Sequence, residues 1–173
     1  MSAPIEFRPA RLEDAAALPA IEQSAGELFR TDTELGWLAD GENLSEARYR
    51  AVIADGWSWV ATSDSALVGF AAATREGDDV HIWELDVARE RQREGIGRTL
   101  LDRLVMAARD QGLLGVTLTT FRDLAWNAPF YRSRGFALLE PDAQDDRLKA
   151  LLAIEVVNGL PPERRCAMRL RLA

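Results

Sequence analysis

Apolar residues in the N-terminal third recur at the spacings of one strand and two helices. Residues 5–9 (IEFRP) form a short extended run that ends at a proline. Apolar side chains then return every three positions between residues 12 and 24, which predicts a helix with one buried face. A second helix is expected within residues 45–54, with Asn43 or Ser45 available as its N-cap.

The middle of the chain contains three strand-like runs, at residues 57–62, 66–74 and 80–87, separated by short polar turns. Alternation along the third run sorts its side chains onto two faces. One face would carry Val80, Ile82, Glu84 and Asp86, and the other His81, Trp83, Leu85 and Val87.

The C-terminal half alternates helical and strand-like segments. Apolar residues at helical spacing from Leu100 to Ala108 predict a helix, and Gly112 is a natural C-cap for it. The later segments are predicted as a strand, a short helix, a strand, a helix and a last strand, at residues 115–121, 125–135, 136–139, 147–158 and 166–172. The whole order predicts a mixed α/β sheet with helices on its faces, in a single domain spanning residues 1–173.

Composition argues against several classes of function. The 173 residues include 28 acidic and 21 basic side chains, a net charge of −7, which gives no basic footprint for a nucleic acid. An acidic surface can attract cationic substrates, but a solvated surface is the commoner meaning. With one cysteine, Cys166, and one histidine, His81, an internal disulfide is impossible and we expect no metal site. The N-terminus lacks a signal pattern and no segment approaches 18 apolar residues, so we expect a cytoplasmic protein without a membrane partner.

The stretch RERQREGIGRTL, residues 89–100, places two glycines between a predicted strand and a predicted helix. It fails the dinucleotide-binding pattern because Leu100 stands where a third glycine is needed. It also fails the P-loop pattern because Arg98, not lysine, follows Gly97. The remaining Q-x-x-G-x-G pattern still favours an anion, since a helix start offers free N–H groups and glycines let a phosphate approach the backbone. A plain glycine-containing turn is the alternative.

This segment resembles motif A of the GNAT superfamily of N-acetyltransferases, in which Q/R-x-x-G-x-G/A follows a long strand. Residues 126–136 (WNAPFYRSRGF) resemble a later segment of the same family, in the style of its small-amine acetyltransferases. One departure is Glu94, where many members carry glycine. The resemblance implies the GNAT acyl-CoA N-acyltransferase fold, a mixed seven-stranded sheet that splays between its fourth and fifth strands.

The resemblance also implies that acetyl-CoA binds in this splay as a cosubstrate. Main-chain groups of Leu85 and Val87 would pair with pantetheine, and Asn127 and Tyr131 would lie beside the pantetheine and the sulfur. The residues implied in acetyl-CoA binding are Leu85, Asp86, Val87, Gln92, Arg93, Glu94, Gly95, Ile96, Gly97, Arg98, Thr99, Asn127, Phe130 and Tyr131.

The implied reaction is direct attack of a primary amine on the thioester in a ternary complex. The protonated amine must lose a proton, and a strand N–H near Val87 could stabilise the charge that develops on the carbonyl oxygen. Tyr131 matches the family tyrosine often assigned as the acid for the leaving thiolate, or it only positions coenzyme A. His81 resembles one of the paired histidines of arylalkylamine N-acetyltransferases, with Trp83 in place of the second. Glu84, expected on the opposite face, and a water relay are the other candidates for the base.

Acceptor specificity in this family depends on two segments, here residues 27–49 and 141–164. Aromatic and acidic side chains of the first could form an amine pocket, or they could be packing and surface residues. They are Phe29, Trp37, Tyr49, Glu27, Asp32, Glu34 and Asp40. The leading hypothesis is an acetyltransferase for a small-molecule amine, with a homodimer possible. A non-catalytic acyl-CoA sensor and a protein or peptide N-terminal acetyltransferase are the alternatives.

Overall fold

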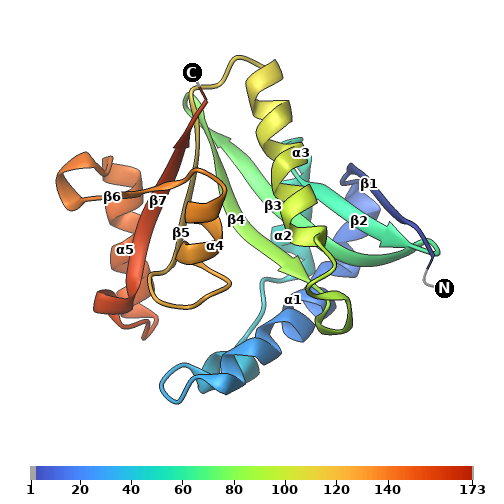
Figure 1. The fold of residues 1–173 in the computed structure, drawn as a ribbon, viewed down its shortest axis with the longest axis horizontal. Coiled ribbons are helices and arrows are strands. Elements are labelled where there is room, and N and C mark those ends of the chain that lie inside the picture. Colours follow the sequence, from blue (N-terminus) through green and yellow to red (C-terminus); the bar gives the residue numbers. More distant parts are fainter. Residues whose placement is uncertain (1–2, 173) are drawn as a thin grey trace.

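The computed structural model describes residues 3–172, and its centre is one seven-stranded sheet (Figure 1). The strand order is β1-β2-β3-β4-β5-β7-β6, and only the β4–β5 pair is parallel. The strands are β1 Ile5–Pro9, β2 Trp59–Ser63, β3 Ala66–Glu76, β4 Asp79–Val87, β5 Gly115–Phe121, β6 Ala137–Leu139 and β7 Arg165–Arg171. The mixed sheet predicted from the sequence is therefore confirmed.

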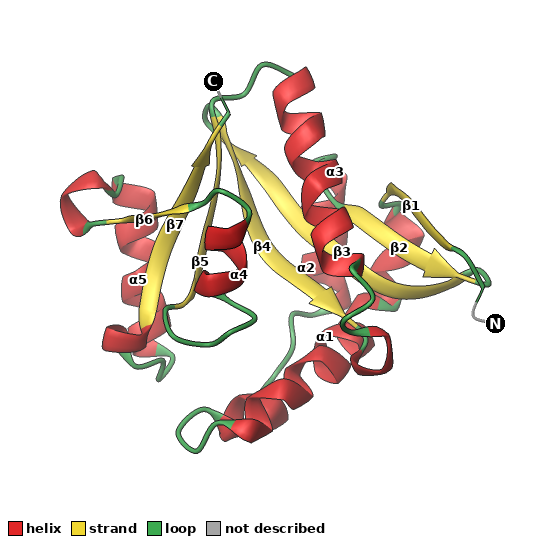
Figure 2. Cartoon of the chain, in the orientation of Figure 1, coloured by secondary structure: helices red, strands yellow, loops and turns green. Residues whose placement is uncertain are grey.

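Helices cover both faces of this sheet (Figure 2). They are α1 Leu18–Gly26, α2 Glu46–Ala54, α3 Ile96–Asp110, α4 Ala128–Ser133 and α5 Asp146–Val157. Helix α3 packs on β2, β3 and β4, and α4 joins the same buried cluster. Helices α1 and α2 pack on the opposite face of β3 and β4, while α5 packs on β5 and β7.

The first helix begins later than the sequence pattern predicts. Residues 12–16 form a 3₁₀ turn, and α1 starts only at Leu18. Pro19 explains the break, because proline is tolerated in the first turn of an α-helix but not in its interior. Two predicted helix ends are confirmed: Ser45 Oγ accepts the Arg48 N–H at 3.1 Å, and Gly112 follows α3 with φ of 71°.

A β-bulge in β4 changes which side chains share a face. Ile82 pairs with Ala73 and Glu84 with Ala72, so Trp83 is an extra residue in the ladder. The prediction that Glu84 lies opposite His81 is therefore wrong, because the bulge adds one residue to the alternation. Beyond it, Leu85 and Val87 pack on the α3 face with Val80 and Ile82. Glu84 and Asp86 lie with His81 and Trp83 on the α1–α2 face.

The parallel pair β4–β5 separates along its length. Its pairing ends at His81 opposite Thr117, and beyond that point the described residues of β4 and β5 make no further pairs. Strand β5 stays paired with β7 to its last residue, Phe121. Figure 1 shows the two strands meeting at one end and diverging toward α1. The predicted splay between the fourth and fifth strands is present, and the predicted site residues lie around it.

Candidate active site

The loop from β4 to α3 is held in shape by its own side chains. The Gln92 amide donates to Val87 O at 3.1 Å, which ties the loop to the end of the strand. Arg91 pairs with Glu94 at 3.0 Å, so the Glu94 carboxylate is neutralised inside the loop. Gly95 adopts φ of 79°, a left-handed conformation that costs glycine little. Helix α3 begins directly after it.

This loop presents a series of free N–H groups. Within residues 3–172, the backbone N–H groups of Arg93, Glu94 and Gly95 donate no hydrogen bond. In the first helical turn, the N–H groups of Ile96, Gly97 and Arg98 have no intrahelical partner either, while the Thr99 N–H donates to Gly95 O at 3.0 Å. Exposed Arg93 and Arg98 add positive charge beside them, and the helix dipole contributes in the same direction. The geometry fits a polyanion such as a pyrophosphate.

The edge of β4 that faces the gap also offers main-chain groups. The Ala88 N–H donates to Val68 O of β3 at 2.9 Å. Successive residues of a strand direct their N–H groups to opposite sides. The N–H groups of Leu85 and Val87 therefore point away from β3, toward the gap. Both residues were implied in acetyl-CoA binding, and their backbone is oriented for that role.

Tyr131 lies in α4, on the other side of the gap. Its ring packs edge-to-face against Phe130 at 5.1 Å and Phe136 at 5.5 Å between ring centroids. Of the two tyrosines, Tyr49 donates its hydroxyl to Glu22, whereas the Tyr131 hydroxyl makes no hydrogen bond to another described residue and is free for a ligand. Burial raises the pKa of Tyr131, and the charges of Asp86 and Glu84 raise that pKa further. The hydroxyl therefore stays protonated at neutral pH and can donate a proton.

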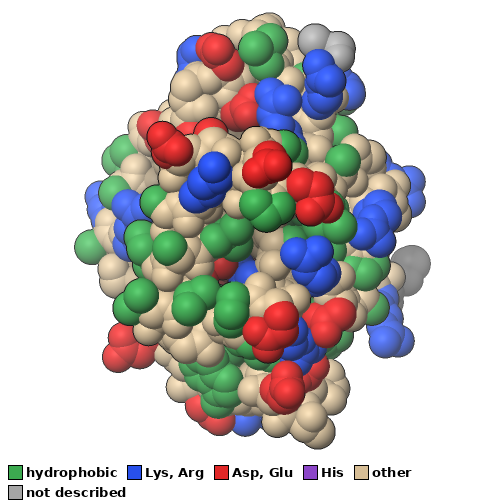
Figure 3. All heavy atoms as spheres, turned by 90° about the vertical axis from the view of Figure 1, so that its left-hand side faces the viewer, with side chains coloured by type: hydrophobic (Ala, Val, Ile, Leu, Met, Phe, Trp, Pro, Cys, Tyr) green, Lys and Arg blue, Asp and Glu red, His purple; other side chains and the backbone are tan. Residues whose placement is uncertain are grey.

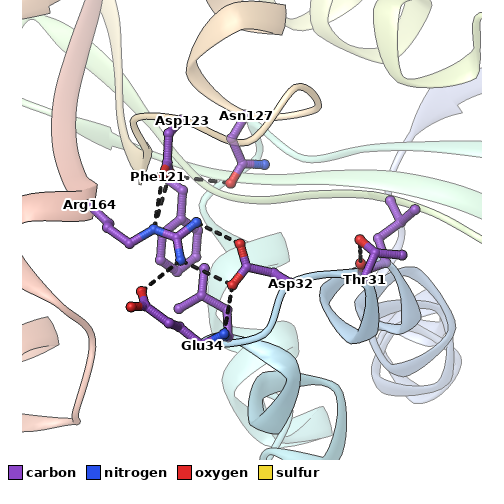
Figure 4. Close-up of polar contacts among 9 residues, drawn as sticks. Thr31, Asp32, Glu34, Phe121, Asp123, Asn127 and Arg164 are labelled. Atoms are coloured by element: carbon purple, nitrogen blue, oxygen red, sulfur yellow. Dashed lines mark hydrogen bonds and ion pairs between the residues drawn. The ribbon is translucent and has the colours of Figure 1, made fainter.

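Asn127 precedes α4 and connects it to β5. Its Oδ1 accepts the Phe121 N–H at 3.4 Å, where β5 ends (Figure 4). The Tyr131 N–H in turn donates to Asn127 O at 3.1 Å. Asn127 therefore positions the helix that carries Tyr131.

His81 is fully buried and hydrogen-bonded. Its side chain is 1% exposed, and Nδ1 lies 2.9 Å from Thr117 Oγ1, which also accepts a hydrogen bond from Arg147 at 3.1 Å. Burial and the charge of Arg147 lower the pKa of His81 to about 3. Such an imidazole stays neutral and lies at the closed end of the gap. These features are those of a packing residue more than those of a base.

Three carboxyl groups meet on the α1–α2 side of the gap. Glu84 and Asp86 come from β4, and Glu22 from α1. Glu22 Oε2 accepts the Tyr49 hydroxyl at 2.5 Å and the Leu44 N–H at 3.0 Å. Burial raises the pKa of Asp86 to about 8, with a smaller contribution from Glu22. Burial, then the charges of Asp86 and Glu22, raises the pKa of Glu84 well above its usual range. This cluster can hold and release protons near neutral pH.

The sequence analysis did not select Glu22, and it gave Asp86 only a cofactor-binding role. A signal for Glu22 exists in the sequence. It lies four residues after Leu18 and three before Ala25, both buried, so helical spacing places it on the inward face of α1. An acidic residue on a buried helix face needs a partner or a function.

A guanidinium lies across the gap from this cluster. Arg165 of β7 pairs bidentately with Glu155 of α5, at 2.8 and 2.9 Å. Glu155 also accepts the Thr119 hydroxyl at 2.6 Å. The guanidinium carbon lies 4.5 Å from the centre of the Phe121 ring. The charge of Arg165 partly opposes the rise in the pKa of Glu84, which places the two side chains within each other's field.

The segment between α1 and α2 closes the far end of the gap. Phe29 packs edge-to-face on Phe121 at 5.6 Å and on Trp126 at 6.1 Å between ring centroids. Arg164, just before β7, pairs with Asp32 at 2.7 Å (Figure 4). It also pairs with Glu34 at 3.1 Å and with Asp123 at 3.0 Å. We call this group, Arg164 with its three carboxylates, the Arg164 clamp.

The acidic side chains predicted for the acceptor pocket have other roles. Asp32 and Glu34 belong to the Arg164 clamp, while Glu27 and Asp40 both pair with Arg30. These four carboxylates are thus paired with arginines of the protein itself. Tyr49 belongs to α2 and is buried, with its ring 5.3 Å from that of Phe70 between centroids. Trp37 is 48% exposed. These ion pairs are what the packing and surface alternative expects of the four acidic residues.

A hollow lies outside the gap, against β7 and the start of α5. Its volume is about 470 Å³, and its lining includes Asp79, Thr117, Leu148 and Arg169. Figure 3 views the side that carries β6 and α5, where charged side chains of both signs are mixed with apolar ones. Asp79 and Arg169 pair with each other at 2.8 Å. The hollow contains none of the residues implied in acetyl-CoA binding or proton transfer, although Leu148 belongs to the 141–164 segment implied in acceptor specificity.

No set of three or more acidic, cysteine and histidine side chains within residues 3–172 is arranged to hold a metal ion. Over the same residues, no helix combines the length and the apolar character that a membrane crossing requires.

Comparison with known proteins agrees with the geometry of the gap. Residues 54–138 match the profile of a family described as an acetyltransferase (GNAT) domain. The PaiA N-acetyltransferase of Thermoplasma acidophilum, solved in complex with coenzyme A, is 18% identical with a TM-score of 0.73, over 97% of this chain and 99% of that chain. The ribosomal-protein-S18-alanine N-acetyltransferase of Escherichia coli is 18% identical with a TM-score of 0.69, over 98% and 95%.

A third solved structure is similar over only part of its own length. The N-acetylglutamate synthase of Neisseria gonorrhoeae, complexed with coenzyme A and N-acetyl-glutamate, is 20% identical with a TM-score of 0.70. The match covers 100% of this chain and 36% of that one. At these identities the structures establish a shared fold. The domain match, which contains the glycine loop and Tyr131, identifies residues 54–138 as an acetyltransferase (GNAT) domain.

Proposed function

We propose that this enzyme transfers the acetyl group of acetyl-CoA to a primary amine of a small molecule, by direct attack in a ternary complex. The observation that carries the proposal is the arrangement around the β4–β5 gap. An anion-binding loop lies at the end of β4, and Tyr131 and three carboxyl groups lie around the gap. Coenzyme A in the PaiA complex supports the choice of donor.

The chain's own backbone would bind the donor. Free N–H groups from Arg93 through the start of α3 suit the pyrophosphate, with Gln92 holding the loop in place. The gap-facing N–H groups of Leu85 and Val87 suit the amides of pantetheine. When bound, acetyl-CoA supplies the activated acetyl group. The Val87 N–H is also available to the carbonyl oxygen as its negative charge grows.

Proton transfer is assigned to the carboxyl cluster and Tyr131. The ammonium form of the acceptor loses a proton to the cluster of Glu22, Glu84 and Asp86, which titrates as a unit with raised pKa values. The freed nitrogen forms the new C–N bond while the C–S bond breaks. Tyr131 donates its proton to the leaving sulfur, and the second proton lost by nitrogen restores the tyrosine. One proton passes to solvent in each cycle. We prefer this cluster to His81 because the imidazole is buried at the closed end of the gap.

A small acceptor is favoured over a peptide because the far end of the gap, where β5 ends at Phe121, is blocked by the segment that follows α1. Phe29 packs on Phe121 and Trp126, and the Arg164 clamp joins the segment after α1 to the start of β7. A peptide would need an open groove across this region. The contacts that would block it are both apolar and ionic, so they hold the segment at two points.

The test is thiol release from acetyl-CoA across small amines, amino acids and short peptides, with coenzyme A binding measured by calorimetry. We expect release with at least one small amine, and little with peptides. Release with peptides alone would support the N-terminal acetyltransferase alternative. Binding of coenzyme A without release for any acceptor would support the sensor alternative and overturn the proposal.

A further inference from the structure

The carboxyl cluster has no cationic partner among the described residues that would balance its charge when it ionises. Among the ion pairs formed by residues 3–172, none includes Glu22, Glu84 or Asp86. Glu22 is satisfied only by the Tyr49 hydroxyl and the Leu44 N–H. Asp86 Oδ2 is buried without a hydrogen-bond partner in the described structure. A buried carboxylate oxygen normally has a hydrogen-bond partner. The absence of one at Asp86 Oδ2 points to a ligand that donates a hydrogen bond there.

Arg165, the cation that faces the cluster, is already paired with another carboxylate. Arg165 makes two hydrogen bonds to Glu155, and its side chain is 11% exposed. It therefore has little charge to offer the carboxylate of an amino acid acceptor. An acceptor carboxylate placed here would instead face Glu22, Glu84 and Asp86. The site as built attracts positive charge and repels negative charge.

The cluster is also spread along the direction from donor to acceptor. Asp86 is adjacent in sequence to Val87, at the end of β4 that leads into the anion-binding loop. Beyond the effect of burial, the charge of Asp86 raises the pKa of Tyr131 more than the charge of Glu84 does, and Glu22 is not among the groups that raise that pKa. Glu22 lies on α1, against Tyr49 of α2. Asp86 thus belongs to the reacting end and Glu22 to the distal end.

Resting on the proposed function, we infer that the acceptor is an alkyl diamine or polyamine, whose distal ammonium is bound by Glu22 and Glu84 while its reacting nitrogen faces Asp86 and Tyr131. The reacting nitrogen must become neutral before it attacks, so it cannot also supply a lasting positive charge. A second amino group separates these two tasks. Glu22 then acts as the residue that selects for this second charge.

Three acceptors of matched length test this inference: pentylamine, 1,5-diaminopentane and lysine. The diamine adds one charge to pentylamine, and lysine adds one carboxylate to the diamine. We expect kcat/KM for the diamine to exceed that for pentylamine on the order of tenfold or more. Lysine should be poorer than the diamine by a similar factor. The preference for the diamine should shrink at high ionic strength, because salt screens the charge contacts.

The variant Glu22→Gln removes the charge and keeps an oxygen that can accept the Tyr49 hydroxyl. It should lower the ratio of diamine to pentylamine kcat/KM on the order of tenfold. Glu6→Gln is the matched control, since Glu6 is exposed on the edge strand β1; it should leave the ratio unchanged.

The outcomes separate the two claims. Equal turnover of pentylamine and the diamine, or of lysine and the diamine, would overturn the inference and leave the acetyltransferase proposal standing. An equal loss with both amines in Glu22→Gln would also overturn it. Absence of turnover with every amine, despite coenzyme A binding, would overturn the proposed function itself.

Discussion

The chain contains two tyrosines, and the structure gives them opposite roles. Tyr49 is completely buried, packs on Phe70 and donates a hydrogen bond to Glu22. Tyr131 makes no side-chain hydrogen bond within the described residues, and its pKa is raised by burial and then by the charges of Asp86 and Glu84 on β4. Replacing each by phenylalanine removes one oxygen and preserves the ring. The two variants are therefore each other's control.

The expected size of each effect follows from these contacts. A hydrogen bond to a carboxyl group contributes about 1 to 3 kcal/mol, the lower value applying when the carboxyl is protonated. Tyr49→Phe should therefore lower the melting temperature by roughly 2 to 12 °C in a chain of this size. Tyr131→Phe removes no such bond and should change it by no more than about 2 °C. Loss of a general acid should instead lower kcat by about a hundredfold or more.

Differential scanning fluorimetry and steady-state thiol release measure both effects, and calorimetry with coenzyme A checks that the donor site persists. We expect Tyr49→Phe to lose stability and Tyr131→Phe to lose kcat while binding coenzyme A normally. A Tyr131→Phe enzyme with undiminished kcat would refute the acid role. A Tyr49→Phe protein as stable as wild type would show that the bond to Glu22 contributes little.

Three further predictions concern the loop, the carboxyl cluster and the clamp. Gly97→Ala should leave stability equal or raise it by up to about 1 kcal/mol, because a Cβ there meets only Val87 at an ordinary 3.6 Å; it should lower kcat/KM for acetyl-CoA severalfold, and an unchanged value would argue against phosphate binding at α3. Asp86 has its folded-state pKa raised from 3.8 to about 8, so its contribution to stability is full below pH 3.8 and is lost as pH rises toward 8. The melting temperature should therefore fall between pH 6.5 and 8. This window lies above the pH range in which protonation of His81 changes stability. The variant Asp86→Asn should flatten the fall, and an identical slope would contradict the assignment. Arg164→Met should raise KM for the amine severalfold and leave KM for acetyl-CoA unchanged, since the clamp closes only the acceptor end; equal changes in both would indicate a general loss of structure.

The sequence was sufficient for the fold because its elements are strongly periodic. The runs of apolar residues and the turns between them predicted the order of strands and helices, and the glycine loop with residues 126–136 located the family. The spacing of apolar residues in the sequence does not reveal, however, where a β-bulge inserts an extra residue into a strand. The bulge at Trp83 moved Glu84 and Asp86 to the face of His81, and it invalidated the expected separation of the two candidate bases.

The parts of the site that were missed depend on contacts between distant residues. Glu22 reaches β4 from α1, and only the packing of α1 on β4 brings it beside Glu84 and Asp86. Arg164 and Asp32 are 132 positions apart, and no local pattern pairs them. The aromatic and acidic residues at 27–49 suggested a pocket, but the ion pairs to Arg30 and the clamp occupy their charges.

The most direct test of the central claim is product analysis by mass spectrometry. The enzyme would be incubated with acetyl-CoA and a pool of diamines, monoamines, amino acids and short peptides at equal concentration. We expect acetylated diamine as the main product, with its yield strongly reduced in Tyr131→Phe. Acetylation confined to peptide N-termini, or no acetylated product while coenzyme A binds, would contradict it.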